Sequence, residues 1–112
     1  MFGNPMQLLS MLGNMGKIRE RVTESVEKLR GQRLTGSAGG GLVEVDVNGM
    51  GEVQACRIDP SLMGGDREML EDLVVSAMTD SVRRSREAQK ELMMDAAKEM
   101  GIPGAAEIMG GL

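Results

Sequence analysis

Apolar residues recur every three or four positions between residues 8 and 29, the spacing of one face of an α-helix. Pro5 suits a first helical turn and Gly31 suits a stop, so we predict a helix over residues 5–30. The alternation of three and four is that of a heptad repeat, which favours packing against another helix. The apolar stripe consists of Leu8, Met11, Met15, Ile18, Val22 and Leu29, with Val26 beside a gap at Ser25.

The middle of the chain changes to strict alternation of apolar and polar residues, which predicts a strand over residues 42–47. Asn48-Gly49 follows and is a strong hairpin signal. The return strand is expected over residues 52–59, and its alternation slips by one residue, which predicts a bulge near Gln54–Ala55.

A weaker edge strand is expected over residues 33–38, before a bend at Gly39–Gly41. A second long helix is predicted over residues 66–100, and Gly101 and Pro103 suit its end. Its expected inner face consists of Met69, Leu70, Leu73, Val74, Ala77, Met78, Ser81 and Val82, continued by Leu92, Met93, Ala96, Ala97 and Met100.

These elements predict an α+β fold with the order α-β-β-β-α, a small antiparallel sheet and two long helices. Residues 1–100 are expected to form a single domain, followed by a flexible Gly/Met-rich tail over residues 101–112. The helices would be about 40 and 50 Å long, whereas the strands would span only about 20 Å. Apolar overhangs of that size need a partner surface, which predicts a two-fold homodimer.

Composition narrows the chemistry. The 112 residues include one Cys and no His, which fits a reducing compartment and excludes the usual His/Cys zinc sites and His-dependent nucleophiles. Phe2 is the one aromatic residue, so binding of single strands by stacking is not expected. No apolar run approaches the ~20 residues that span a bilayer. We therefore expect a cytoplasmic protein without catalytic residues, metal or other cofactor, and without a membrane role.

Three local features allow a functional interpretation but have a simpler structural one. Gly36 to Gly41 lacks the Lys and Ser/Thr of a phosphate-binding loop, so a tight bend is favoured. Glu44 and Asp46 could bind a metal, but the solvated face of a half-buried strand is favoured. Cys56 could be a reactive thiol, but a small buried apolar residue is favoured.

The densest positive stretch runs from Val82 to Lys90, where Arg83, Arg86 and Lys90 share one helix face. Such a face could bind a polyanion, or it could be a solvated face on which Asp80 pairs with Arg83 or Arg84. The net charge of −4 argues mildly against polyanion binding, so a DNA-binding function needs cations that are concentrated locally.

Short motifs in the middle of the chain resemble the YbaB/EbfC family of bacterial nucleoid-associated proteins, in the family's order and spacing, over about residues 1–100. The motifs are Thr35-Gly36, Ala38 to Val43, Val45, Val47-Asn48-Gly49, Gly51-Glu52-Val53, Ile58 to Leu62 and Glu68 to Leu73, after the opening Met1-Phe2-Gly3-Asn4.

The resemblance implies a tweezers-like homodimer with a shared sheet and two helical arms. It also implies binding of double-stranded DNA at the nucleoid, in chromosome organisation or gene regulation. The contacts are expected to be phosphate-led and of low sequence specificity. They map onto basic residues of the two helices: Lys17, Arg19, Arg21, Arg83, Arg84, Arg86 and Lys90. The alternative function is that of a dimeric protein-interaction adaptor whose Met-rich helical arms hold other proteins.

Overall fold

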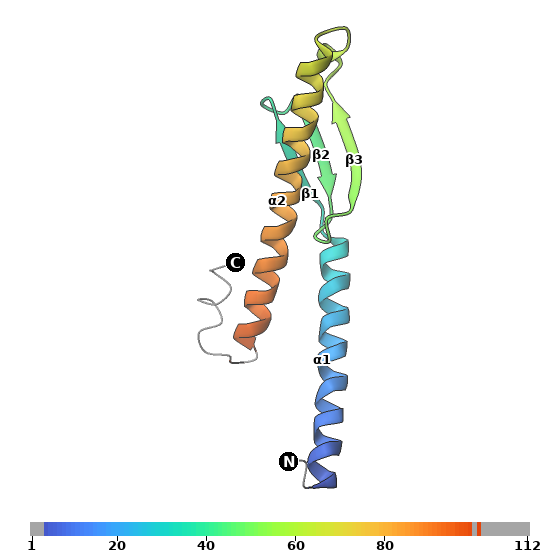
Figure 1. Cartoon of the computed structure of the whole chain (residues 1–112), viewed down its shortest axis with the longest axis vertical. Helices are drawn as coiled ribbons and strands as arrows, with labels where there is room; N and C mark the ends of the chain where they lie inside the picture. The colour runs from blue at the N-terminus through green and yellow to red at the C-terminus, as the bar shows by residue number, and fades with distance from the viewer. Residues whose placement is uncertain (1–3, 100, 102–112) are drawn as a thin grey trace.

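The computed structural model describes residues 4–99 and Gly101. Its elements are α1 (Pro5–Gly31), β1 (Leu34–Ala38), β2 (Val43–Val47), β3 (Val53–Ile58), the short 3-10 helix η1 (Pro60–Leu62) and α2 (Arg67–Glu99). The antiparallel sheet has the order β1-β2-β3, so the predicted α-β-β-β-α order is confirmed (Figure 1). The flexibility predicted for residues 102–112 concerns a part of the chain outside the described residues.

Both ends of α1 are set by local chemistry. The Asn4 side chain accepts a hydrogen bond from the Met6 N–H at 3.0 Å, and Pro5 occupies the first helical position, where no N–H is needed. Lys28 and Arg30 lie in the last turn, where the helix dipole favours positive charge. The helix then stops at Gly31 because Gln32 adopts an extended backbone.

The core lies between one face of the sheet and the N-terminal half of α2. Gly36 of β1 lets the two elements approach, since a Cβ there would lie 2.5 Å from the Ala77 carbonyl oxygen and 2.6 Å from Ser81 Cα. Because residues along β2 point alternately to the two faces of the sheet, its valines all lie on the face that α2 covers. The buried cluster is Val43, Val45, Val47, Leu62 and Ala77, with Leu34, Ala38, Leu42, Ile58, Leu70, Leu73 and Val74 packed around it.

The molecule is strongly elongated, with extents of 72 × 25 × 21 Å. The sheet and the first half of α2 form one end, and two helical arms project from it (Figure 1). We call α1 the long arm and residues 83–99 of α2 the short arm. Within the described residues, neither helix has an apolar stretch long enough to cross a bilayer.

The hairpin between β2 and β3 joins both arms. The Gly49 N–H donates to the Leu29 carbonyl at 2.7 Å, while the Gly49 carbonyl accepts from Ser85 Oγ at 3.0 Å and Gln89 Nε2 at 2.8 Å. A Cβ on Gly49 would lie 2.8 Å from the Leu29 carbonyl oxygen, so this three-way contact needs glycine. The end of α1 is thereby fixed against α2.

The turn itself is longer than the Asn48-Gly49 signal alone indicates. The Asn48 N–H donates to the Glu52 carbonyl, and the positive φ of +81° falls on Gly51. The Asn48 Oδ1 atom accepts from the backbone N–H groups of Met50 and Glu52, each at 3.0 Å. The hairpin is thus confirmed at the predicted place, closed by the Asn48 side chain.

The predicted bulge is also confirmed. Asp46 faces Ala55, and the next residue, Val47, faces Val53, so Gln54 is the extra residue. The bulge restores the alternation of β3 and puts Val53 and Ile58 on the sheet face that carries the β2 valines.

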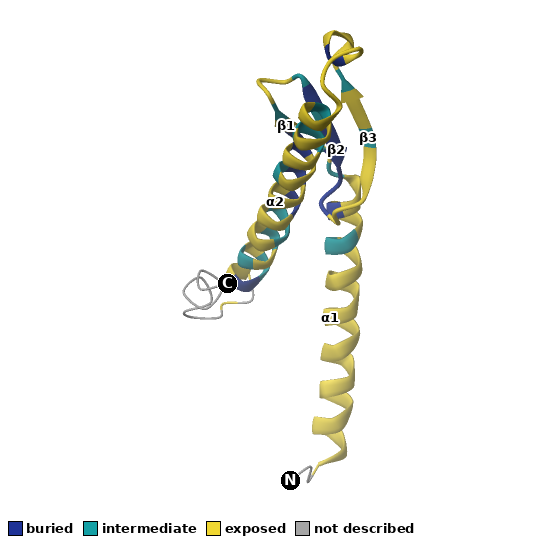
Figure 2. Ribbon diagram, turned by 45° about the horizontal axis from the view of Figure 1, so that its top comes forward, coloured by how far each residue is buried: buried dark blue, intermediate teal, exposed yellow. Residues whose placement is uncertain are grey.

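That face is covered unequally, because α2 packs on β1 and β2 and makes little contact with β3. Cys56 is exposed, so the prediction that it is buried was wrong within the protomer. Met69, Met78 and Val82 were also expected to face inward, yet all three are exposed. Figure 2 shows that much of α2 is exposed.

Candidate nucleic-acid interface

The seven predicted DNA-contacting residues all lie on the two arms, and all are exposed. The long arm carries Lys17, Arg19 and Arg21, and the short arm carries Arg83, Arg84, Arg86 and Lys90. The arms therefore present their cations to solvent, away from the buried core at the sheet.

Two of the short-arm arginines are held by one carboxylate. Arg83 Nη2 lies 2.6 Å from Asp80 Oδ1, and Arg84 Nε lies 3.2 Å from Asp80 Oδ2. Glu87 Oε1 lies 2.9 Å from Arg83 Nη1. The interpretation in which Asp80 pairs with its neighbouring arginines thus holds for Arg83 and Arg84. Their charges are balanced locally, which weakens their contribution to a positive face.

Asp80 is itself fixed by the sheet. Its Oδ2 atom accepts a hydrogen bond from the Ser37 backbone N–H at 3.0 Å. That bond, together with the hydrogen bonds from Arg83 and Arg84, holds the pKa of Asp80 well below its usual range. Asp80 also raises the pKa of Arg83. The carboxylate therefore stays ionised at neutral pH and orients both guanidinium groups.

The other predicted cations differ from this pair. Within residues 4–99, Lys17, Arg19, Arg86 and Lys90 have no carboxylate within 4.0 Å, whereas Arg21 Nη1 lies 3.1 Å from Glu99 Oε2. An exposed cation without a neighbouring acid can bind a phosphate oxygen at little electrostatic cost. Among the seven predicted cations, these four thus carry the unbalanced positive charge of the arms.

A charged cluster on the outer face of the sheet was not anticipated from the sequence. Asp46 is 1% exposed, so the prediction of a solvated carboxylate at this position was wrong. Arg57 binds it through two nitrogens, at 2.6 and 2.9 Å, and Arg33 Nη2 lies 2.9 Å from Asp46 Oδ2. Thr35 Oγ1 also donates to Asp46, at 2.9 Å.

These contacts determine the charge state of the cluster. The hydrogen bonds from Arg57, then Arg33 and Thr35, hold the pKa of Asp46 well below its usual range. Asp46 in turn raises the pKa of Arg57. Asp46 of β2 thus binds Arg33 just before β1, Thr35 of β1 and Arg57 of β3. The cluster therefore links all three strands on the side of the sheet away from α2. Diagonal cross-strand spacing of Asp46 and Arg57 is the sequence signal that could have indicated it.

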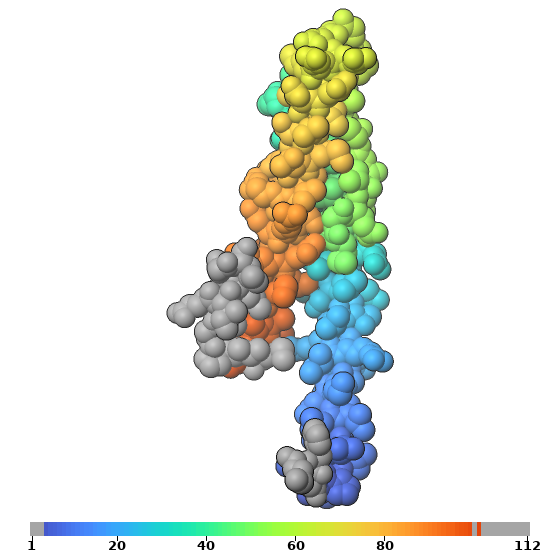
Figure 3. All heavy atoms as spheres, viewed as in Figure 1, coloured from blue at the N-terminus to red at the C-terminus, as the bar shows by residue number. Residues whose placement is uncertain are grey.

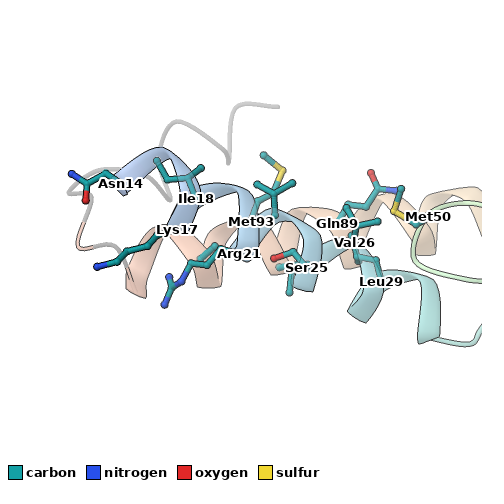
Figure 4. Close-up of a pocket in the computed structure, with 13 residues that line it drawn as sticks. Asn14, Lys17, Ile18, Arg21, Ser25, Val26, Leu29, Met50, Gln89 and Met93 are labelled. Carbon is teal, nitrogen blue, oxygen red and sulfur yellow. The ribbon is translucent and has the colours of Figure 1, made fainter. Parts of the chain in front are cut away.

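A groove of about 730 Å³ lies between the two arms. Figure 4 shows Val26, Leu29, Met50 and Gln89 at the end next to the hairpin, and Asn14 and Lys17 at the opposite end. Most of its lining is apolar, although Lys17 and Arg21 stand at its rim. The long-arm cations therefore border an apolar groove.

Comparison with known proteins agrees with this architecture. The chain is similar to an uncharacterized protein from Helicobacter pylori, HP0035, whose crystal structure matches with a TM-score of 0.64 and 31% sequence identity. The match covers 83% of this chain and 96% of that chain. The model of the YbaB/EbfC DNA-binding family matches residues 3–100, nearly the whole of the present sequence. The chain therefore belongs to the YbaB/EbfC DNA-binding family.

Proposed function

We propose that the protein binds double-stranded DNA as a homodimer, mainly through phosphate contacts and with low sequence specificity. Its place is the cytoplasm, at the nucleoid, and its role lies in chromosome organisation or gene regulation. The observation that carries the proposal is that four of the predicted arm cations are exposed and have no carboxylate within 4.0 Å in residues 4–99, in a chain of a DNA-binding family. They are Lys17, Arg19, Arg86 and Lys90.

The charge distribution supports this function in spite of the net charge of −4. Asp46 and Asp80 are each held by two arginines, so neither presents an unbalanced negative charge to a ligand. Cations on a projecting arm can approach phosphates while the acidic remainder of the molecule stays farther away. Screening over about 8 Å at physiological salt makes that separation effective.

The dimer is supported by an apolar surface beside the core. Asp80 lies on the β1 side of α2, where it accepts the Ser37 N–H. Residues two positions apart in a helix point about 200° apart, so Met78 lies on the opposite flank, toward β3. We call this surface the apolar step. It consists of the exposed Val53 and Cys56 on β3 and the exposed Val75, Met78 and Val82 on α2, with the half-buried Ile58 at its edge.

A second copy is the natural cover for the apolar step. Exposed apolar patches rimmed by polar residues mark interaction sites. A two-fold axis through such a step would lay the α2 helix of each protomer beside β3 of the other, giving each small sheet the second layer that it lacks. The dimer would then carry two pairs of arms, and bivalent binding strengthens weak phosphate contacts.

Removing the unpaired short-arm cations is expected to weaken DNA binding for every sequence. Arg86→Ala with Lys90→Ala should lower affinity about tenfold or more, and the slope of log affinity against log salt should fall by about 1 for each lost contact. Fluorescence anisotropy with a labelled duplex measures both quantities. The single variant Lys90→Ala should also weaken binding. Arg67→Ala is its control, since this variant likewise removes one positive charge, at the far end of α2.

The control should bind like the wild type, because Arg67 pairs with Glu71 in the first turns of α2 and lies outside the arms. Equal losses in Lys90→Ala and Arg67→Ala would mean that overall charge governs binding. In that case the arm cations would not form the interface.

A further inference from the structure

Within the part of the chain that the structure describes, nothing covers the N-terminal half of the long arm. Figure 3 shows this part of α1 extending beyond the end of the short arm. Residues 5–16 contain no Asp, Glu, Lys or Arg, yet every one of them is exposed. An uncharged helix with an apolar stripe gains stability by burying that stripe. The exposed stripe residues in this half are Leu8, Met11 and Met15.

The C-terminal half of the same stripe lines the groove between the arms. Ile18, Val22 and Val26 form one wall, and Leu92, Met93 and Ala96 of α2 form the other. The two helices make little contact with each other along this groove. Ile18, Val22 and Met93 remain exposed in it. The groove therefore needs an apolar, helix-shaped occupant.

We propose that the N-terminal half of α1 from a second copy occupies this groove, and that the exchange is reciprocal. The two α1 helices would run antiparallel, so that the free end of each lies along the groove of the other. This register places Leu8 opposite Val26, Met11 opposite Val22 and Met15 opposite Ile18. One two-fold axis relates all three pairs, so each stripe is covered along its whole length.

The chemistry favours this occupant. Burying an ionised group in an apolar groove is costly. The docked segment carries no charged side chain, so its insertion avoids that cost. For the same reason it does not neutralise Lys17 at the rim. The stripe follows the heptad spacing on which antiparallel helices interlock. With both α2 helices as outer walls, the pair becomes a four-helix arrangement.

This contact lies far from the apolar step, toward the other end of a molecule 72 Å long. Two different two-fold interfaces on one chain generate an extended series of copies unless their axes close a ring. Arm pairing would therefore link DNA-bound dimers to one another.

The first test measures the mass of the full-length protein by light scattering and sedimentation over a range of concentrations. Wild type should exceed twice the chain mass of 12.0 kDa at high concentration, and Met11→Glu with Met15→Glu should stop at twice that mass. The control is Met6→Glu with Leu9→Glu, on the opposite face of the same exposed helix, and it should assemble like the wild type.

Other masses are equally informative. A wild type at twice the chain mass with a stripe variant at the monomer mass would support arm pairing and disprove the dimer through the apolar step. Stripe and control variants of equal mass would overturn arm pairing, whatever holds the dimer. Circular dichroism on both variants confirms that they are folded, which the exposure of all four sites leads us to expect.

The second test probes the register by disulfide cross-linking. In a Cys56→Ser background, separately purified Leu8→Cys and Val26→Cys chains are mixed and oxidised. A cross-linked species of twice the chain mass is expected, whereas Leu9→Cys mixed with Val26→Cys should give little. A groove filled by residues 102–112 of the same chain would give the cross-link only after those residues are deleted. That result, or equal yields from both mixtures, would overturn the proposal.

Discussion

Gly36→Ala is expected to destabilise the protomer by about 3 kcal/mol or more, the upper range for forcing an atom into a packed interior. The added methyl group would meet the Ser81 backbone nitrogen, with Ala77 O at 2.5 Å and Ser81 Cα at 2.6 Å. All three atoms belong to the α2 backbone, so no side-chain rotation relieves the clash. The helix would have to move off the sheet, and the valines of β2 would lose their cover.

Chemical denaturation followed by far-UV circular dichroism measures the effect. Gly13→Ala is the matched control, since a Cβ at Gly13 meets nothing within 4 Å. Alanine is favoured over glycine in a helix by up to about 1 kcal/mol, so this variant should be as stable as the wild type or more stable. A Gly36→Ala protein with wild-type stability would show that α2 does not pack on β1 as described.

Met78→Glu is expected to separate the dimer and thereby reduce DNA affinity by about 100-fold, the range in which linked binding sites differ from single ones. Met78 is exposed in the protomer, so the added carboxylate costs little there. In the dimer it would be buried against an apolar surface without a partner, which is strongly unfavourable. Sedimentation measures the mass, and duplex anisotropy measures the affinity.

Ser76→Glu adds the same charge on the exposed outer side of α2 and should leave both mass and affinity near wild type. Cys56→Glu, on β3, should behave like Met78→Glu, because the two residues belong to one surface on different elements. If Met78→Glu and Cys56→Glu both stay dimeric, the copies meet elsewhere and the apolar step is not their interface.

The order of elements was predictable because it depends on local patterns. The heptad stripe of α1 and the alternation of β2 are properties of neighbouring residues, and each element lies within two residues of its predicted bounds. The slip of one residue in β3 similarly indicated the bulge at Gln54. The cations on both arms followed from the same helical periodicity.

The remaining features depend on tertiary arrangement. The alternation in β3 indicates which of its residues face the α2 side of the sheet, but not how far α2 reaches across that side. Because α2 covers β1 and β2 and makes little contact with β3, Cys56 is exposed, although the alternation predicted that it is buried. Alternation assigns Asp46 correctly to the outer face, but Arg33 and Arg57 then cover it there. The sharing of Asp80 between Arg83 and Arg84 was weighed as an alternative, and Ser37 of β1 anchors it in the fold.

The most direct test of DNA binding through the arms is a salt series with the full-length protein and two unrelated duplexes of equal length. If Lys17, Arg19, Arg86 and Lys90 of each protomer contact phosphate, log affinity should fall with log salt with a slope of about −7 in the dimer. Both duplexes should give similar affinities and slopes. Binding that is absent at low salt, or that does not change as salt rises, would contradict the account.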